Sequence, residues 1–349
     1  MSLQTEKAKS QQIAEKLEKE ILHGQLAPGV RIQSVRALAN RFEVSIKVIQ
    51  IVFDILEKKQ LIERRHGSGT FIKEIKMMQK ERIAFLFLAS RNIEESYHFQ
   101  VFRGVCNEMR KHGFSVDLAM EYDPAELKKN YSGIVFSSTI DHATIKNVMK
   151  TKLPCVVYGN VANIEGLCEV NPDYYNGSVM AVDYLCSCNL KKIIFIKTPK
   201  EFNKRNQVCF EGYKKGLSKN AIPFDKDLVW CFSEMDEKLD AMHDKLKNGN
   251  YAFYIPNDAT AYDINKRLRK RGFKIAKEVG LMGFYNRNYA QLANPGLTTV
   301  SFDHELMGIT VAKKLCEVIL GNKPESALIP VKIIKRESIS EPQCLLTEA

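Results

Sequence analysis

The sequence predicts two unlike units: a small helical unit with a β-hairpin in residues 1–73, and a two-lobed α/β unit with parallel sheets in residues 83–340. Apolar residues at helical spacing, followed by two short strands around a glycine-rich turn, indicate the first unit. Strand-length apolar runs that alternate with amphipathic helices indicate the second, which is too long for one doubly wound lobe. Residues 74–82 are the expected linker and residues 341–349 the expected C-terminal tail.

Positive charge is concentrated in the first unit. The chain holds 52 Lys and Arg against 41 Asp and Glu, a net charge of +11. Residues 1–76 hold 14 Lys and Arg against 9 Asp and Glu, so the excess per residue is far denser there than in the rest. A local basic excess favours a polyanion as partner, although basic solvated faces are common.

Composition argues against a membrane protein, a disulfide scaffold and an enzyme. No apolar run approaches the roughly 18 residues of a membrane span, and the polar N-terminus predicts no secretory signal. The 9 cysteines lack metal-ligand spacing and are typical of reduced thiols in a cytoplasm. The 7 histidines are scattered, and neither a phosphate-binding loop nor a nucleophile elbow is present. We therefore expect no catalytic residue, no cofactor, no metal and no membrane association.

Three helices are predicted in the first unit. Gly24 and the Pro28-Gly29 turn end the first helix, and Ser34 and Ser45 can cap the second and third. The inward-facing residues, helix by helix, are Ile13, Ala14, Leu17, Ile21 and Leu22; Val35, Leu38, Ala39 and Phe42; and Ile49, Val52, Phe53 and Leu56.

Two short strands complete this unit. Leu61–Arg65 and Thr70–Lys73 flank the turn His66-Gly67-Ser68-Gly69. Three helices and a two-stranded wing make a winged helix-turn-helix domain. In that fold the third helix enters the major groove, and the tip of the wing lies along the backbone or the minor groove.

Residues 24–72 resemble the DNA-binding domain of GntR-type bacterial regulators. The segment reads GQLAPGVRIQSVRALANRFEVSIKVIQIVFDILEKKQLIERRHGSGTFI, with turn, cap, helices and wing in the family's order. The resemblance covers about residues 11–73. It implies that Arg36 contacts a phosphate or a base, that Ser45 caps against a phosphate, and that His66 and Gly67 form the wing contact.

The recognition helix departs from the family pattern. Where the family shows Arg, Thr and Arg, this chain has Ile46, Val48 and Gln50. Ile46 and Val48 either touch thymine methyl groups or extend the core, whereas Gln50 can read adenine and Lys47 a guanine or a phosphate. The expected DNA-binding residues are Arg36, Ser45, Ile46, Lys47, Val48, Gln50, Arg65, His66 and Gly67.

In the second unit, apolar runs predict parallel strands. They are Ile83–Ala89, Val116–Ala119, Ile134–Ser137, Cys155–Tyr158, Ile193–Ile196, Ala252–Ile255 and Gly280–Phe284. Helical patterns between them include Gln100–His112, Tyr174–Cys188, Glu211–Lys219 and Ala261–Arg271. Lobes of this kind bind ligands at the carboxyl ends of their strands, so two facing lobes form a cleft.

Six segments of this unit resemble, in order, the effector domain of LacI-type repressors, which is itself similar to periplasmic sugar-binding proteins. They are FRGVCNEMRKHGF, YSGIVF, NPDYYNGSVMAVDYLCSCNLKKIIFI, YIPNDATA, LMGFYNRNYAQLANPGLTTV and LIPVKIIKRESI, within about residues 82–340. The resemblance implies three ligand-contact positions: an aromatic residue at Tyr97, an Asp at a helix start at Asp173, and an Asn at a strand end at Asn257.

Two ligand positions of the family are changed. Its cleft arginine falls on Cys209, which we read as an inert buried thiol, and the first Asp of its Asp pair falls on Tyr285. Because Arg and Asp are typical clamps for sugar hydroxyls, their absence argues against the standard sugar-binding mode, although Arg205 or Gln207 can replace the arginine. Aromatic residues here either pack in the core or suit an apolar face such as a deoxysugar's. The expected ligand-binding residues are Tyr97, Phe99, Tyr158, Asp173, Arg205, Gln207, Asn257 and Tyr285.

The two resemblances together imply a cytoplasmic, homodimeric transcription regulator. We expect a repressor of carbohydrate-utilisation genes that a sugar or sugar derivative releases from double-stranded operator DNA. A sugar-binding receptor module without DNA binding is one alternative, but it leaves residues 1–76 unexplained. A sugar-processing enzyme is another, but the sequence lacks an acid–base or nucleophile constellation for it. Salt-sensitive DNA binding by the intact chain distinguishes the three.

Overall fold

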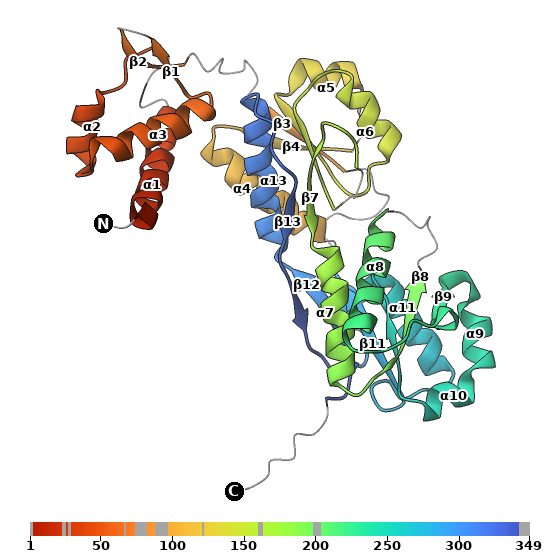
Figure 1. Cartoon of the computed structure of the whole chain (residues 1–349). Helices are drawn as coiled ribbons and strands as arrows, with labels where there is room; N and C mark the ends of the chain where they lie inside the picture. Colours follow the sequence, from red (N-terminus) through yellow and green to blue (C-terminus); the bar gives the residue numbers. More distant parts are fainter. Residues whose placement is uncertain are drawn as a thin grey trace, which may run out of the picture.

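A winged helix-turn-helix domain is followed along the chain by two lobes with parallel sheets (Figure 1), which confirms the predicted fold class. The structure is a computed structural model that describes residues 3–22, 26, 29–65, 68–73, 82–87, 97–120, 122–159, 163–197 and 204–341. Residues 74–81 of the expected linker and residues 342–349 of the expected tail lie outside the described residues.

The N-terminal domain forms around its own hydrophobic core. Its elements are α1 (Leu3–Leu22), α2 (Val35–Phe42), α3 (Ile46–Lys58), β1 (Ile62–Arg65) and β2 (Gly69–Ile72). The side chain of Ser34 accepts a hydrogen bond from the Ala37 amide and that of Ser45 from the Val48 amide, so both serines cap helices as predicted. The apolar faces of the three helices are buried together against the hairpin.

The first lobe has a six-stranded sheet in the order β13-β7-β6-β5-β3-β4, in which all neighbours are parallel. Its elements are β3 (Arg82–Leu86), α4 (Tyr97–Lys111), β4 (Ser115–Ala119), α5 (Pro124–Asn130), β5 (Gly133–Phe136), α6 (His142–Met149), β6 (Cys155–Tyr158), β7 (Cys168–Pro172), α13 (His304–Ile319) and β13 (Ala327–Ile329). Helices α4 and α13 cover one face of this sheet, and α5 and α6 cover the other.

The second lobe repeats this plan with the order β14-β12-β11-β10-β8-β9, in which only the edge strand β14 is antiparallel. Its elements are α7 (Tyr174–Ser187), β8 (Lys192–Lys197), α8 (Lys204–Lys219), β9 (Val229–Cys231), α9 (Met235–Ala241), α10 (His243–Asn248), β10 (Tyr251–Tyr254), α11 (Asp258–Lys270), β11 (Val279–Phe284), α12 (Asn288–Leu292), β12 (Thr298–Phe302) and β14 (Val331–Ile334). Short 3-10 turns at Lys226–Leu228 and Phe232–Glu234 flank β9. Helix α8 begins well before the predicted start at Glu211, because Asn206 and Cys209 are already on its buried face.

Three chain crossings join the lobes. The chain passes between them after β7, after β12, and between β13 and β14. The carboxyl ends of the parallel strands of both lobes face the space between the lobes (Figure 1). At its far end, α13 is followed by Leu320, which packs against the core of the N-terminal domain. None of the described helices is both long and apolar enough to cross a membrane.

Helices α4 and α13 approach each other closely at a pair of glycines. A Cβ atom at Gly104 would overlap the backbone carbonyl oxygen of Glu305 and lie 3.1 Å from the Cα of Gly308. Both obstacles are backbone atoms, which cannot rotate away as a flexible side chain can. The contact therefore holds only while both positions lack side chains.

We expect Gly104→Ala to lower the free energy of unfolding by about 1–3 kcal/mol, because the two helices must separate to admit the methyl group. Alanine is the better helix former, so intrinsic helix propensity acts in the opposite direction. Urea denaturation of this variant and of the exposed Arg110→Ala on the same helix measures the effect. A Gly104→Ala protein as stable as wild type would contradict the close packing.

Candidate DNA-binding and ligand-binding sites

The first turn of α3 presents its side chains to solvent. Ser45, Ile46, Lys47 and Gln50 are exposed, with Ile46 47% exposed. Val48 is only 3% exposed and belongs to the core of the domain. The structure thus separates the two apolar residues: Ile46 is free to meet a base, whereas the expectation that Val48 contacts DNA is corrected because its side chain packs inward.

Arg36 and Lys47 are exposed basic side chains on the helices expected to meet DNA. Several other basic residues of this domain form ion pairs, namely Arg41 with Glu20, Lys59 with Glu18, Arg64 with Asp54 and Glu57, and Arg65 with Glu63. Within the described part of the chain, no acidic side chain pairs with Arg36 on α2 or Lys47 on α3. These two cations are therefore available for phosphate contacts. The expected wing contacts His66 and Gly67 lie outside the described residues.

Aromatic side chains fill the space between the two lobes. The members of this cluster are Tyr97, His98, Tyr158, Tyr174, Tyr285, Phe302 and His304, all buried. The rings of Tyr97, from the first lobe, and Tyr285, from the second, lie 5.4 Å apart. The ring of His304, at the start of α13, lies 5.3 Å from that of Tyr97. Two of the expected ligand residues, Tyr97 and Tyr285, are thus in contact across the lobes.

A chain of hydrogen bonds runs through this cluster. Nη1 of Arg205 donates to the Tyr285 hydroxyl at 2.9 Å, and that hydroxyl lies 3.2 Å from the hydroxyl of Tyr174. The Tyr174 hydroxyl donates to the carbonyl oxygen of Gly159, in the first lobe, at 3.4 Å. The chain therefore connects α8 of the second lobe to the end of β6 in the first.

Two histidines of the cluster are held neutral. Burial lowers the pKa of His98 to about 3, and its Nδ1 shares a 2.7 Å hydrogen bond with the Tyr158 hydroxyl. Burial also lowers the pKa of His304, whose Nε2 donates to the backbone carbonyl of Tyr285 at 3.0 Å. Both rings thus act as hydrogen-bonding groups without charge at neutral pH.

Beside the cluster, the first residue of α11 carries a fully buried carboxyl group. Asp258 accepts hydrogen bonds from the backbone N–H of Arg287 at 2.7 Å and from the Thr299 hydroxyl at 2.7 Å. Burial nevertheless raises its pKa to about 7. The Arg287 side chain lies over the rings of Tyr97 and Tyr289, with its guanidinium carbon 5.9 Å and 5.8 Å from their centroids.

Several expected ligand residues have other positions or roles. Asp173 and Asn257 cap helices: Asp173 accepts from the Asn176 amide, and Asn257 accepts from the amides of Ala259 and Thr260. Asp173 also lines the cavity between the lobes, so its contact with a ligand stays a prediction, as does that of Asn257, whose side-chain oxygen is engaged in capping.

Phe99 and Gln207 are exposed, and Phe99 is 41% exposed outside the buried cluster. Neither belongs to the buried cluster, and their contact with a ligand stays a prediction. Cys209 is buried, and burial raises the pKa of its thiol to about 11, as suits an inert core residue.

Sequence reasoning missed five residues of this region. They are His98, Tyr174, Asp258, Arg287 and His304. Two signals were available: Asp258 follows Asn257 directly, and Arg287 follows the Tyr285-Asn286 pair. Nothing in the spacing of the two histidines along the chain indicates that they meet around Tyr97.

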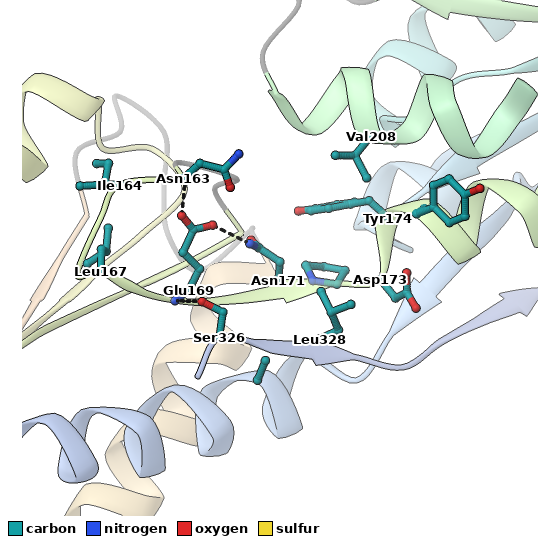
Figure 2. A pocket seen from close by; sticks show the side chains of 13 residues that line it. Asn163, Ile164, Leu167, Glu169, Asn171, Asp173, Tyr174, Val208, Ser326 and Leu328 are labelled. Atoms are coloured by element: carbon teal, nitrogen blue, oxygen red, sulfur yellow. Dashed lines mark hydrogen bonds between the residues drawn. The ribbon is translucent and has the colours of Figure 1, made fainter. Parts of the chain in front are cut away.

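A cavity of about 400 Å³ opens between the lobes next to Tyr174, whose hydroxyl points toward its middle (Figure 2). The Glu169 carboxylate, on β7, accepts hydrogen bonds from the Asn163 amide N–H at 2.6 Å and from the Asn171 side chain at 3.1 Å. Val208 on α8 and Leu328 on β13 add apolar surface. This cavity combines a polar wall with an apolar wall, as small-molecule sites do.

We expect replacement of Asp258 by Asn to stabilise the protein relative to wild type increasingly as pH rises. The raised pKa means that the folded state binds more protons than the unfolded state between pH 4 and pH 7, so wild-type stability falls across that range. The printed pKa of about 7 limits this loss to about 4 kcal/mol. The asparagine oxygen can still accept from the Arg287 N–H, and its amide nitrogen can donate to the Thr299 hydroxyl oxygen, without the charge.

Urea unfolding of wild type and Asp258→Asn at pH 5, 6, 7 and 8 measures this difference. The variant should gain on wild type at each step toward pH 8. A difference in stability that stays constant across the series would show that Asp258 does not titrate as its burial indicates.

Comparison with known proteins places both parts of the chain. Residues 9–72 match the family described as bacterial regulatory proteins, gntR family, and residues 182–339 match the periplasmic binding protein-like domain. The chain is 20% identical over 323 residues to the arabinose metabolism transcriptional repressor of Geobacillus stearothermophilus, covering 86% of this chain and 88% of that protein. It is 25% identical over 284 residues to the NTD biosynthesis operon regulator NtdR of Bacillus subtilis strain 168, covering 74% and 83%.

A solved structure is similar over most of the chain. The complex of the transcriptional regulator CelR with cellobiose superposes with a TM-score of 0.65 at 18% identity, covering 88% of this chain and 100% of that one. This likeness shows the shared fold. The two domain matches show that the chain joins a domain of the type described as bacterial regulatory proteins, gntR family, to a periplasmic binding protein-like domain.

Proposed function

We propose that this protein is a cytoplasmic repressor of carbohydrate-utilisation genes that binds operator DNA as a homodimer and releases it when a sugar derivative binds between the lobes. The observation that carries the proposal is the union, in one chain, of an exposed α3 N-terminus with a buried aromatic cluster between two lobes. The repressor role is supported by relatives such as the arabinose metabolism transcriptional repressor.

The N-terminal domain has what DNA binding requires. Arg36 and Lys47 are exposed, and neither forms an ion pair with an acidic side chain of the described residues. Gln50 and Ile46 face solvent on the same helix, where they can meet an adenine edge and a thymine methyl group. Helix-turn-helix domains read pseudo-palindromic sites in pairs, which supports a two-fold dimer.

The space between the lobes has what a sugar derivative requires. Tyr97 and Tyr285 pack on each other here, and in an arrangement with the lobes further apart their rings would meet an apolar face, such as that of a deoxysugar, and their hydroxyls would hydrogen-bond it. Ligand binding there favours one arrangement of the lobes over another. Two heads held by a dimer then lose the spacing that matches two half-sites, so ligand binding and DNA binding oppose each other.

The test is DNA binding by the intact chain to fragments from upstream of its own gene, followed by gel shift or fluorescence anisotropy. We expect affinity to fall steeply with salt, because Lys and Arg displace counterions from phosphates. A scrambled duplex of equal length is the control. Binding that is absent, or equal for both duplexes at every salt concentration, would overturn the regulator assignment.

Substitutions should separate phosphate contacts from base contacts. Arg36→Ala should weaken binding to all sequences alike and reduce the slope of log affinity against log salt by about 1. Gln50→Ala should cost about 1–3 kcal/mol on the preferred site and relax the preference at one base pair. If Gln50→Ala left the ranking of half-site variants unchanged, its base-reading role would be wrong.

A further inference from the structure

We infer that the effector carries an anionic group, a carboxylate or a phosphate, that Arg205 and Arg287 bind from the second lobe. The inference deepens the proposed function and rests on it for the sugar part of the ligand. It concerns the charge of the effector, which the fold alone leaves open.

Arg205 is a cation with few partners. It lies in the first turn of α8, where its Nη1 donates to Tyr285 and its Nη2 to the Asn206 side chain at 3.3 Å. Its Nε is buried and has no hydrogen-bond partner. Neither acceptor carries a charge, so the positive charge is not balanced by what it touches.

The Arg287 side chain likewise has a buried donor without a partner. Its guanidinium group lies over two tyrosine rings, and its Nε is also buried without a hydrogen-bond partner. Throughout the described ranges, no Asp or Glu side chain forms an ion pair with either arginine. The guanidinium carbon of Arg205 lies 5.7 Å from the ring centroid of Tyr285, and that ring lies 5.4 Å from the Tyr97 ring that Arg287 contacts.

The surrounding titratable groups do not supply the missing negative charge. Burial raises the pKa of Tyr97, Tyr158 and Tyr174, so their hydroxyls stay protonated. Both histidines are neutral at pH 7, as described above. Among the described acidic groups, Asp258 acts electrostatically with Arg287, and burial raises its pKa to about 7, so it is only partly ionised at neutral pH.

Within the described residues, these two partly buried guanidinium groups form no ion pair, which leaves an excess of positive charge beside the cluster. Burial of an unbalanced charge costs free energy, and a bound anion removes that cost through charge-assisted hydrogen bonds. A neutral sugar offers hydroxyl groups, which satisfy donors but leave the charge unbalanced. An anionic sugar derivative supplies both hydrogen-bond acceptors and the balancing negative charge. The two buried, unpartnered Nε atoms are the donors that would bind it.

The first experiment compares matched ligands by thermal shift and calorimetry on the intact chain. The probes are D-glucose, D-glucuronate and D-glucose 6-phosphate, the corresponding galactose series, and inorganic phosphate and sulfate at fixed ionic strength. We expect anionic members to raise the melting temperature (Tm) more than their neutral counterparts. A ligand that binds only the folded state stabilises it more when it binds more tightly. The uronate and phosphate arms distinguish the two sources of negative charge.

Arg205→Gln and Arg287→Gln give the specificity control. Each substitution should lower the affinity for the anionic ligand of a pair by at least about 10-fold, so that this ligand no longer binds more tightly than the neutral one. Arg103→Gln, whose parent residue pairs with Glu305 on the surface, should leave the advantage intact. A neutral sugar that binds more tightly than its anionic counterpart, or an anion response that both cleft variants retain, would overturn the inference.

A second measurement needs no ligand. Arg205→Gln and Arg205→Lys both disturb the hydrogen bonds to Tyr285 and Asn206, but only the lysine variant keeps the positive charge. If the arginine lacks a counter-charge, the ligand-free Arg205→Gln protein should have a Tm about 1–3 °C above that of Arg205→Lys. A Tm for Arg205→Gln at or below that of Arg205→Lys would mean that the charge is already balanced and would overturn the inference, even if no probe of the panel binds.

The two proposals can fail separately. A chain that binds operator DNA and is released by a neutral sugar keeps the regulator assignment and loses the anionic effector. A chain that binds anions through Arg205 but binds no DNA keeps the anion site and loses the regulator assignment.

Discussion

Burial of polar groups between the lobes is the constraint on which the ligand-binding half of the structure depends. The hydroxyls of Tyr174 and Tyr285 are removed from water there, so each must find a hydrogen-bond partner inside the protein. They find one another, Arg205 and the carbonyl oxygen of Gly159. Because these partners come from both lobes, satisfying them fixes how the lobes meet.

Much of the fold follows from local signals in the sequence. Capping serines, the helical spacing of apolar residues and the glycine-rich wing turn define the N-terminal domain, and continuous apolar runs locate the central strands of both lobes. The strands that sequence reasoning missed include β9 and β13, with three residues each and mixed burial. Such strands exist because a neighbouring strand pairs with them, and that pairing is not visible in their own residues.

The candidate site was harder to predict, because its members are close in space but distant in the chain. Arg205 stands one helical turn before Cys209 and occupies the same side of α8. From the sequence it was one of two candidates to replace the family's arginine, with Gln207, because the helix was predicted to begin only at Glu211. Arg287, Tyr174 and the two histidines come from separate loops and helices, and only the folded chain assembles them. Val48 shows a different limit of sequence reasoning. An apolar residue on a recognition helix can serve the core or contact DNA, and only its burial in the folded domain decides between the two.

Helix α13 connects the candidate ligand site between the lobes to the N-terminal DNA-binding domain. It begins with His304, hydrogen-bonded to the backbone of Tyr285, and is followed by Leu320, packed on the core of the N-terminal domain. Its 16 residues form one continuous helix of roughly 24 Å. Gly104 and Gly308 hold it tightly against α4, so it can move only together with that helix. Any displacement that a ligand imposes at the cleft end would therefore reach the other end as the tilt of a rigid rod, amplified by its length, rather than fading through side-chain rearrangements along the way.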